Sequence, residues 1–273
     1  MNIEHTDIAM NISEDVLDEV LSQDCDSSGC PSIDLLGGKI KLLQPQDGFR
    51  ASLDSVMVAA ACPAQDGDRV LDMGCGAGSA SFCLLYRVNG CYLCGVDIQE
   101  SCVKMAAQNA VLNNVSERSD FVHCDINQFE VSRPDERFDH IICNPPYLET
   151  GTYLTSPTEE KAIALGHRDQ DVSIEVWIKH AHRLLKSRGS LTLIQRSDML
   201  DDIIQAMGKR FGKIDVIPLW PKTGKISKRV IIRAVKDRRS PLTMYPGIVL
   251  HEEDGSYTAQ ANEILKEAGS LAL

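Results

Sequence analysis

A short apolar run that stops at two consecutive prolines constrains the fold more than any other stretch, Phe138-Asp-His-Ile-Ile-Cys-Asn-Pro-Pro-Tyr147. Residues 141–143 are apolar and rich in β-branched side chains, which is typical of a buried parallel strand. The strand must end at Pro145 because proline has no amide proton for a sheet ladder, and the same proline holds Asn144 extended. The sequence therefore predicts a polar turn at the carboxyl end of a strand, the edge where open α/β sheets bind ligands.

This turn offers two hydrogen-bond acceptors and a ring, from the Asn144 side chain, the Pro145 backbone carbonyl and the Tyr147 phenol. Such a set suits a planar amino group, because the acceptors can take its two protons while the ring stacks on the attached base or amide. Acceptors outside the ring plane also favour a pyramidal nitrogen with a free lone pair. The predicted catalytic residues are Asn144, Pro145, Pro146 and Tyr147. The alternative is a structural Asn-Pro-Pro turn, since Asn-Pro is a common turn dipeptide.

A glycine-rich turn follows the first predicted strand of the α/β unit, residues 69–72. Gly74, Gly76 and Gly78 would let a ligand approach the backbone closely. Their spacing is G-x-G-x-G, which differs from the G-x-G-x-x-G of dinucleotide sites. Asp72 precedes the glycines, where it would repel a pyrophosphate but could bind a cationic amine. The turn therefore favours a zwitterionic amino-acid tail over NAD.

Two further predicted strands also lead into an aspartate. Residues 91–96 precede Asp97, whose distance from the glycines, about twenty residues, is that of an acid that binds ribose hydroxyls. Residues 121–124 precede Asp125, which could accept a proton from an adenine amino group. We therefore expect one ligand cleft over the carboxyl ends of these strands.

Composition excludes several classes of protein. The chain has 273 residues, and no segment approaches the roughly 18 consecutive apolar residues of a membrane span. The N-terminus shows no basic-then-apolar signal pattern, so we expect a cytoplasmic protein with no membrane contact. Of the ten cysteines, most lie in apolar runs as small hydrophobes. Cys91 and Cys94 have the spacing of half a zinc site, but a strand would point them to opposite faces, so we expect neither a metal nor disulfides.

Charge is distributed unevenly along the chain. The net charge is −11, yet residues 1–30 hold eight acids and no Lys or Arg, and without them the chain is near −3. Residues 222–239 hold eight Lys and Arg against one acid, which favours contact with RNA phosphates. The alternative is solvated charge that flanks a strand. The residues assigned to RNA are Lys225, Lys228 and Arg229, with Trp220 as a stacking face.

The chain divides into three expected parts, which are an acidic lead over residues 1–30, an α/β domain over 31–240 and a C-terminal extension over 241–273. The α/β domain is expected to begin with a hairpin of residues 33–36 and 40–43, because two short, mainly apolar runs flank a Gly-Gly turn.

Two loops of the α/β domain could cover a bound ligand. Phe49 and Arg50 stand just before an Ala/Val-rich helix that ends at Pro63, although they could also only pack the start of that helix. Residues 148–170 are a long, turn-rich insertion directly after the predicted reaction strand, and we expect a substrate lid there.

Taken together, the motifs resemble those of the Asn-Pro-Pro-Tyr methyltransferases that use S-adenosylmethionine to modify planar amino groups. The resemblance rests on Asp72-Met-Gly-Cys-Gly-Ala-Gly78, Asp97, Asp125 and Asn144-Pro-Pro-Tyr147. The upstream stretch Gln44-Pro-Gln-Asp-Gly-Phe-Arg-Ala-Ser-Leu-Asp54 is similar to the bacterial tRNA (adenine-N(6)) methyltransferase family, which acts next to the anticodon of valine tRNA. The similarity extends from about residue 33 to 236.

The resemblance implies a class I, Rossmann-like fold, with a seven-stranded, mostly parallel, doubly wound sheet and a small N-terminal hairpin or helix addition. It implies that Asp72 and the glycine turn hold the methionine part of the cofactor. It also assigns the remaining cofactor contacts to Asp97 with Ile98 at the ribose, Asp125 with Ile126 at the adenine, and Asn144. It implies that the target base is held by Asn144, Pro145 and Tyr147. From their position before the helix, Phe49 and Arg50 are also assigned to the substrate.

We therefore predict methyl transfer from S-adenosylmethionine to the exocyclic amine of an adenine in RNA, with tRNA as the first candidate. Two alternatives keep this chemistry, which are a guanine amine in ribosomal RNA and the glutamine amide of a release factor. The release-factor enzymes carry a helical N-terminal domain where this chain has a predicted hairpin, which counts against them. A non-catalytic cofactor-binding scaffold would have no use for both the glycine turn and the Asn-Pro-Pro-Tyr motif.

Overall fold

One large sheet carries the fold of the computed structural model, which describes residues 31–45, 51–146 and 173–271. Its strands are β3 (Arg69–Met73), β4 (Tyr92–Asp97), β5 (Ser119–His123), β6 (Phe138–Cys143), β7 (Leu185–Arg196), β8 (Phe211–Trp220), β9 (Arg229–Lys236), β10 (Thr243–Met244) and β11 (Ile248–Val249). Their spatial order is β10-β8-β9-β7-β6-β3-β4-β5, and β11 also pairs with β8. From β3 the chain first adds β4 and β5 on one side and then β6 and β7 on the other, as in a doubly wound sheet.

The neighbouring strands from β7 through β6, β3 and β4 to β5 all run parallel, whereas β9 is antiparallel to both β7 and β8. The predicted α/β class with a mostly parallel, doubly wound sheet is confirmed. The C-terminal extension adds β10 and β11 to the predicted seven strands, and both pair with β8 in parallel.

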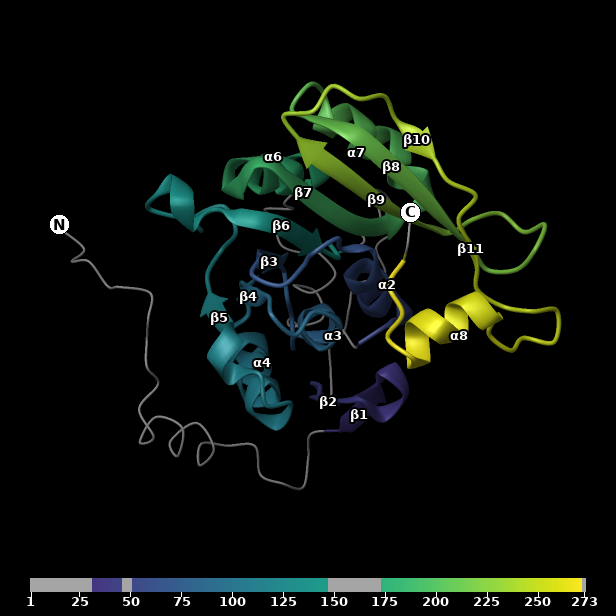
Figure 1. Cartoon of the computed structure of the whole chain (residues 1–273), viewed down its shortest axis with the longest axis horizontal. Helices are drawn as coiled ribbons and strands as arrows, with labels where there is room; N and C mark the ends of the chain where they lie inside the picture. Colours follow the sequence, from purple (N-terminus) through teal and green to yellow (C-terminus); the bar gives the residue numbers. More distant parts are fainter. Residues whose placement is uncertain (1–30, 46–50, 147–172, 272–273) are drawn as a thin grey trace, which may run out of the picture.

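Helices cover both faces of the sheet (Figure 1). They are α2 (Leu53–Ala61), α3 (Ser79–Arg87), α4 (Glu100–Leu112), α6 (Ile174–Leu184), α7 (Leu200–Met207) and α8 (Ala259–Lys266), with 3-10 turns η1 (Leu36–Gly38), η2 (Ser116–Arg118), η3 (Pro134–Glu136) and η4 (Ser197–Met199). Strand alternation separates two apolar clusters: Val70 packs with α2 and α3, whereas Leu71 and Met73 pack with α6 and α7. None of these helices is long and apolar enough to cross a membrane.

The predicted hairpin forms as β1 (Ser32–Leu35) and β2 (Ile40–Leu43), antiparallel and separate from the large sheet. Figure 1 shows α8 beside this hairpin and α2. Lys39 Nζ donates to the Lys266 carbonyl at 2.6 Å and lies 3.0 Å from a Glu267 carboxylate oxygen, which satisfies a carbonyl at the end of α8. Leu271 N–H donates to the Ala60 carbonyl at 2.8 Å. The C-terminal extension is therefore packed against the α/β domain.

The strands of the hairpin, β3 and β4 lie within one residue of the ranges expected from the sequence. No loop separates α6 from β7, since α6 ends at Leu184 and β7 starts at Leu185. β7 can start this early because Phe138 pairs with Leu185 before the register shifts to His140 and Ser190. The acidic lead at residues 1–30 and the insertion at 148–170 lie outside the described residues.

Candidate functional site

The carboxyl ends of three neighbouring strands bring the predicted site residues together. Met73 on β3 is paired with Val96 on β4 and with Cys143 on β6. The residues that follow, Asp97 and Asn144, therefore lie at the same edge of the sheet as the glycine-rich turn after β3. This is the arrangement expected from the series of strand ends.

Each of the three glycines in the turn is required for a different structural reason. All have a positive φ, +71° at Gly74, +53° at Gly76 and +88° at Gly78. A Cβ at Gly74 would lie 2.8 Å from the Trp177 ring, and one at Gly78 would lie 2.3 Å from the Phe82 ring. At Gly76 no described atom lies within 4 Å of the Cβ position. Gly76 is therefore the glycine whose open side can accept a ligand close to the backbone.

Asp97 holds the glycine turn in place. One carboxylate oxygen accepts the Gly76 N–H at 2.8 Å, and the other accepts the Gln99 N–H at 2.9 Å. Burial raises the pKa of Asp97 above its usual value, although these backbone donors act in the opposite direction. The carboxylate thus connects the end of β4 to the turn after β3, where it is placed to accept hydrogen bonds from a ligand hydroxyl.

Asp72 is nearly inaccessible, with 2 % of its surface exposed, and its carboxylate accepts the Ser81 hydroxyl at 2.6 Å. Burial raises its pKa to about 7, and the Ser81 hydrogen bond only partly opposes this. Asp97 lies close enough to raise the pKa further. A cationic group nearby would stabilise both carboxylates.

The third aspartate organises the loop after β5. Asp125 accepts the Asn127 N–H at 2.9 Å, and its backbone carbonyl accepts the Phe129 N–H at 3.0 Å. Ile126 beside it is buried in the cluster under α6, whereas Ile98 after β4 is 45 % exposed. An exposed Ile98 and a half-buried Asp125 leave this part of the edge able to contact a planar ring.

The turn after β6 begins where it was predicted, and residues 144–146 of this predicted reaction turn are described. Asn144 and Pro146 are half-buried, and Pro145 is buried. All described peptide bonds are trans, including those before both prolines. Tyr147, Phe49 and Arg50 lie outside the described residues, so the structure does not place the aromatic side of the predicted amine site.

Trp177 on α6 is a site residue that the sequence analysis missed. Its ring packs against Gly74, and its indole N–H is buried with no hydrogen-bond partner in the part of the chain described. Since Gly74 follows the residue paired with Cys143, the ring covers the glycine turn next to the reaction turn. No spacing in the sequence connects a residue of this helix with the turn after β3.

Asn109 is a second missed residue. It is fully buried on α4 and donates to the carbonyls of Leu43, at 2.9 Å, and Ala77, at 3.0 Å. Its carbonyl accepts the Leu43 N–H at 2.8 Å. A single amide therefore joins the end of the hairpin to the glycine turn.

The basic loop between β8 and β9, residues 221–228, lies at the same edge of the sheet, because β8 runs parallel to β7 and β9 returns. Lys225 and Lys228 are exposed. Arg229, at the start of β9, is half-buried and forms an ion pair with Asp54 at the start of α2, with 3.1 Å between Nε and Oδ2. Arg229 is one of the three cations assigned to RNA, and its ion pair also connects the end of the basic loop to α2.

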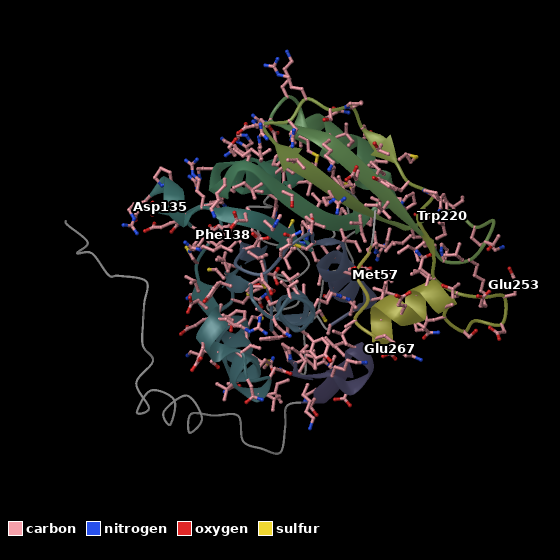
Figure 2. All side chains as sticks on the ribbon, viewed as in Figure 1. Met57, Asp135, Phe138, Trp220, Glu253 and Glu267 are labelled. Atoms are coloured by element: carbon pink, nitrogen blue, oxygen red, sulfur yellow. The ribbon has the colours of Figure 1, made fainter. Side chains whose placement is uncertain are left out.

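Trp220 precedes this loop and has a structural partner. Its indole N–H donates to the Pro246 carbonyl at 2.9 Å, and its side chain is half-buried. Figure 2 shows Trp220 and Glu253 on the same side of the molecule, where Lys222 Nζ donates to the Glu253 carbonyl at 2.7 Å. Trp220 therefore offers less of its face for stacking than the sequence indicated.

The described site contains acceptors, backbone donors and small residues. Among the described residues no three His, Cys, Asp or Glu side chains are grouped as metal ligands would be. The arrangement can hold a ligand with hydroxyl and ammonium groups at Asp97, Gly76 and Asp72. It can also accept the protons of an amine at the adjacent Asn-Pro-Pro turn.

Comparison with known proteins identifies a methyltransferase domain in this chain. Residues 64–237 match a family model described as "Methyltransferase domain". A tRNA1(Val) (adenine(37)-N6)-methyltransferase of Vibrio campbellii is 27 % identical over 149 residues, which is 55 % of this chain and 59 % of that protein. The enzyme of the same name from Dyadobacter fermentans is 25 % identical over 234 residues, covering 82 % of this chain and 91 % of its own length.

Among solved structures, a protein from Agrobacterium tumefaciens described as a predicted O-methyltransferase superposes with a TM-score of 0.66. The two are 24 % identical, and the match covers 81 % of this chain and 99 % of the other. This likeness supports the fold.

Proposed function

Because the chain belongs to the methyltransferase domain family, we propose that it transfers the methyl group of S-adenosylmethionine to the exocyclic amine of an adenine in tRNA. The observation that carries the proposal is the shared edge of β4, β3 and β6, where Asp97 and Gly76 stand next to the Asn-Pro-Pro turn. A methyl donor bound at Asp97 and Gly76 would face an amine bound at the Asn-Pro-Pro turn. We place this activity in the cytoplasm.

The residues at this edge fit S-adenosylmethionine. Gly76 leaves its Cβ direction open, and Asp97 and Asp72 supply acceptors for ribose hydroxyls and for the ammonium of the methionine part. Asp125, Ile126 and Ile98 would contact the adenine ring. When bound, the cofactor supplies a methyl group already activated on a sulfonium, so the protein needs to supply alignment and acceptors.

The amine would be recognised by the turn after β6. The side-chain carbonyl of Asn144 and the backbone carbonyl of Pro145 would accept its two protons, and Tyr147 would stack on the base. These contacts strengthen as the nitrogen becomes pyramidal, so they stabilise the transition state more than the bound substrate. To reach this turn, the adenine must be unstacked from its loop.

Contact with the RNA backbone would come from the basic loop. Lys225 and Lys228 are exposed at the same edge of the sheet as the reaction turn, which supports a role in phosphate binding. Arg229 would act beside them while its ion pair with Asp54 fixes the base of the loop. Phe49 and Arg50 would close over the target base.

The nucleoside content of cells with and without the gene tests the substrate. Digested tRNA from the deletion strain should lack N6-methyladenosine, and the purified protein with S-adenosylmethionine should restore it in that tRNA. The relatives named above suggest adenine 37 of a valine tRNA as the first position to map. Methylguanosine in ribosomal RNA or a methylated glutamine in a release factor would instead identify one of the other amino-group substrates.

Asn144→Ala tests the role of the reaction turn. We expect a rate at least about 100-fold lower, the cost of removing one preorganised polar group, and a far smaller loss of calorimetric affinity for S-adenosylhomocysteine, because the other cofactor contacts remain. Asn262→Ala on α8 is a matched control, because that amide donates to the Tyr257 carbonyl in the segment that follows β11, which pairs with β8, three strands from β6. Turnover of Asn144→Ala equal to that of the parent would make the turn structural.

A further inference from the structure

An isoleucine at the tip of the basic loop has no structural role among the described residues. Ile226 is 85 % exposed, more than any other large apolar side chain that the structure describes. Single apolar side chains on a surface are common and need no explanation by themselves. The argument for Ile226 therefore depends on how its loop is held, where it lies and which charges surround it.

The loop is fixed on both sides of Ile226. Ser227 Oγ lies 3.0 Å from the Leu219 carbonyl and 2.8 Å from the Arg229 carbonyl, so this hydroxyl holds the ends of β8 and β9 together. On the other side, Lys225 N–H donates to the Lys222 carbonyl at 3.2 Å. Because these bonds anchor the backbone, the apolar side chain is presented to solvent by a defined turn.

The position of the loop relates it to the reaction turn. The sheet order β8-β9-β7-β6 places β9 two strand spacings, about 10 Å across the sheet, from β6, the strand that Asn144 follows. Arg196 at the end of β7 is paired with Arg229, which confirms that these ends share one edge. A nucleotide bound at the reaction turn and its neighbours along the chain can therefore reach the loop.

The charges beside Ile226 select an anionic partner. Exposed Lys225 and Lys228 flank it, and the half-buried Trp220 already donates its indole N–H to Pro246. Within the described part of this loop, Ile226 is thus the apolar surface most open to a partner, and it lies between two cations. Single-stranded RNA has this pattern, since an unstacked base exposes an apolar face next to its phosphates.

We infer that Ile226 is an apolar contact for a tRNA base adjacent to the target adenine, while Lys225 and Lys228 bind the flanking phosphates. The inference rests on the proposed function, because extrusion of the adenine is what exposes the face of its neighbour. Covering that face with Ile226 would stabilise the unstacked conformation of the tRNA loop, as apolar side chains do when they are inserted between base steps. Ile226 would then act in substrate binding and leave the methyl donor unaffected.

The test compares Ile226→Ser with two other variants in tRNA binding measured over a range of salt concentrations, with S-adenosylhomocysteine present. Removing an apolar side chain from the interface should weaken affinity about tenfold at every salt concentration and raise KM for tRNA, without changing the salt slope. Lys225→Ala with Lys228→Ala should instead flatten the slope, by roughly one unit for each phosphate that is no longer bound. Met244→Ser, which removes a 62 % exposed apolar side chain from β10, should match the parent.

Fluorescence of 2-aminopurine beside the target adenine gives a second measurement. It should rise when the parent binds and rise less with Ile226→Ser, and Ile226→Leu should restore the parental signal. A parent that methylates tRNA together with an Ile226→Ser variant of equal affinity, KM and fluorescence would overturn the role of Ile226 alone. A parent that neither binds nor methylates tRNA would overturn both this role and the proposed function.

Discussion

Replacing Asp72 with asparagine should make the protein more stable above neutral pH while weakening cofactor binding. The carboxylate is buried, and burial raises its pKa from 3.8 to about 7. The difference between the two values corresponds to about 4 kcal/mol that the folded state loses when the carboxyl must ionise. Removing the ionisable carboxyl avoids this loss. Ser81 donates to the carboxylate at 2.6 Å, however, and its weaker bond to an amide would offset about 1–2 kcal/mol of the stability gained. Asp72→Asn should therefore be stabilised by about 2–3 kcal/mol at pH 8.

The direction of the pH effect follows from proton binding. Between the unfolded value of 3.8 and the folded value of about 7, the folded chain keeps a proton that the unfolded chain has released. The contribution of Asp72 to stability thus falls as pH rises through this window and stays at its lowest above it. Urea unfolding of the cofactor-free protein at pH 5 and pH 8 measures the effect. The difference in stability between Asp72→Asn and the parent should be small at pH 5 and favour the variant at pH 8.

A matched variant separates burial from hydrogen bonding. Ser81→Ala removes the donor that lowers the pKa of Asp72, so it should destabilise the protein most at pH 8, opposite to Asp72→Asn. If Asp72 binds the ammonium of the methionine part as proposed, binding of S-adenosylhomocysteine should release protons near pH 6.5, as measured by calorimetry in buffers of different ionisation enthalpy. If the stability difference between Asp72→Asn and the parent does not change with pH, the carboxyl does not carry the raised pKa.

Two further predictions concern the glycine turn. Asp97→Ala should weaken S-adenosylhomocysteine binding by about 1–3 kcal/mol in calorimetry, because it removes both the proposed ribose acceptor and the partner of the Gly76 N–H; an unchanged affinity would contradict that role. Gly76→Ala should cost about 1–2 kcal/mol of stability through its positive φ and strongly reduce cofactor affinity. Gly78→Ala should lose more stability in urea unfolding, since its methyl would lie 2.3 Å from the Phe82 ring, and equal losses for the two variants would refute this distinction.

Local sequence patterns were enough to predict most of the sheet. The strand expected at 69–72 is β3, and the hairpin and the aspartates at strand ends lie where short apolar runs and turn residues placed them. These signals are local, because each strand alternates or runs apolar over its own few residues. β10 and β11 could not be predicted in this way, since each has two residues and forms only by pairing with β8.

The parts of the site that the sequence did not predict depend on side chains far apart in the chain. The ion pair of Arg229 with Asp54 spans 175 residues, and the Asn109 bonds to Leu43 span 66. No periodicity or motif encodes such a contact, because it depends on how strands and helices are ordered in space. Trp177 is the same case, since only the packing of α6 over β3 brings its ring to Gly74.

The basic stretch at 222–239 illustrates how structure changes the meaning of a charge count. β9 carries its cations from the ligand edge of the sheet to the opposite edge, so Arg238 and Arg239 lie beyond its far end. Within the strand, Arg233 is paired with Asp215 at 3.0 Å, and Lys236 donates to two backbone carbonyls.

Within this stretch, Lys225 and Lys228 are therefore the exposed cations nearest the reaction turn. Two phosphate contacts give a salt slope of only about 1.5–2. With two such contacts from this stretch, much of the affinity for RNA must come from other groups, including contacts that salt does not screen. The Asn-Pro-Pro turn and Ile226 are the described groups placed to supply them.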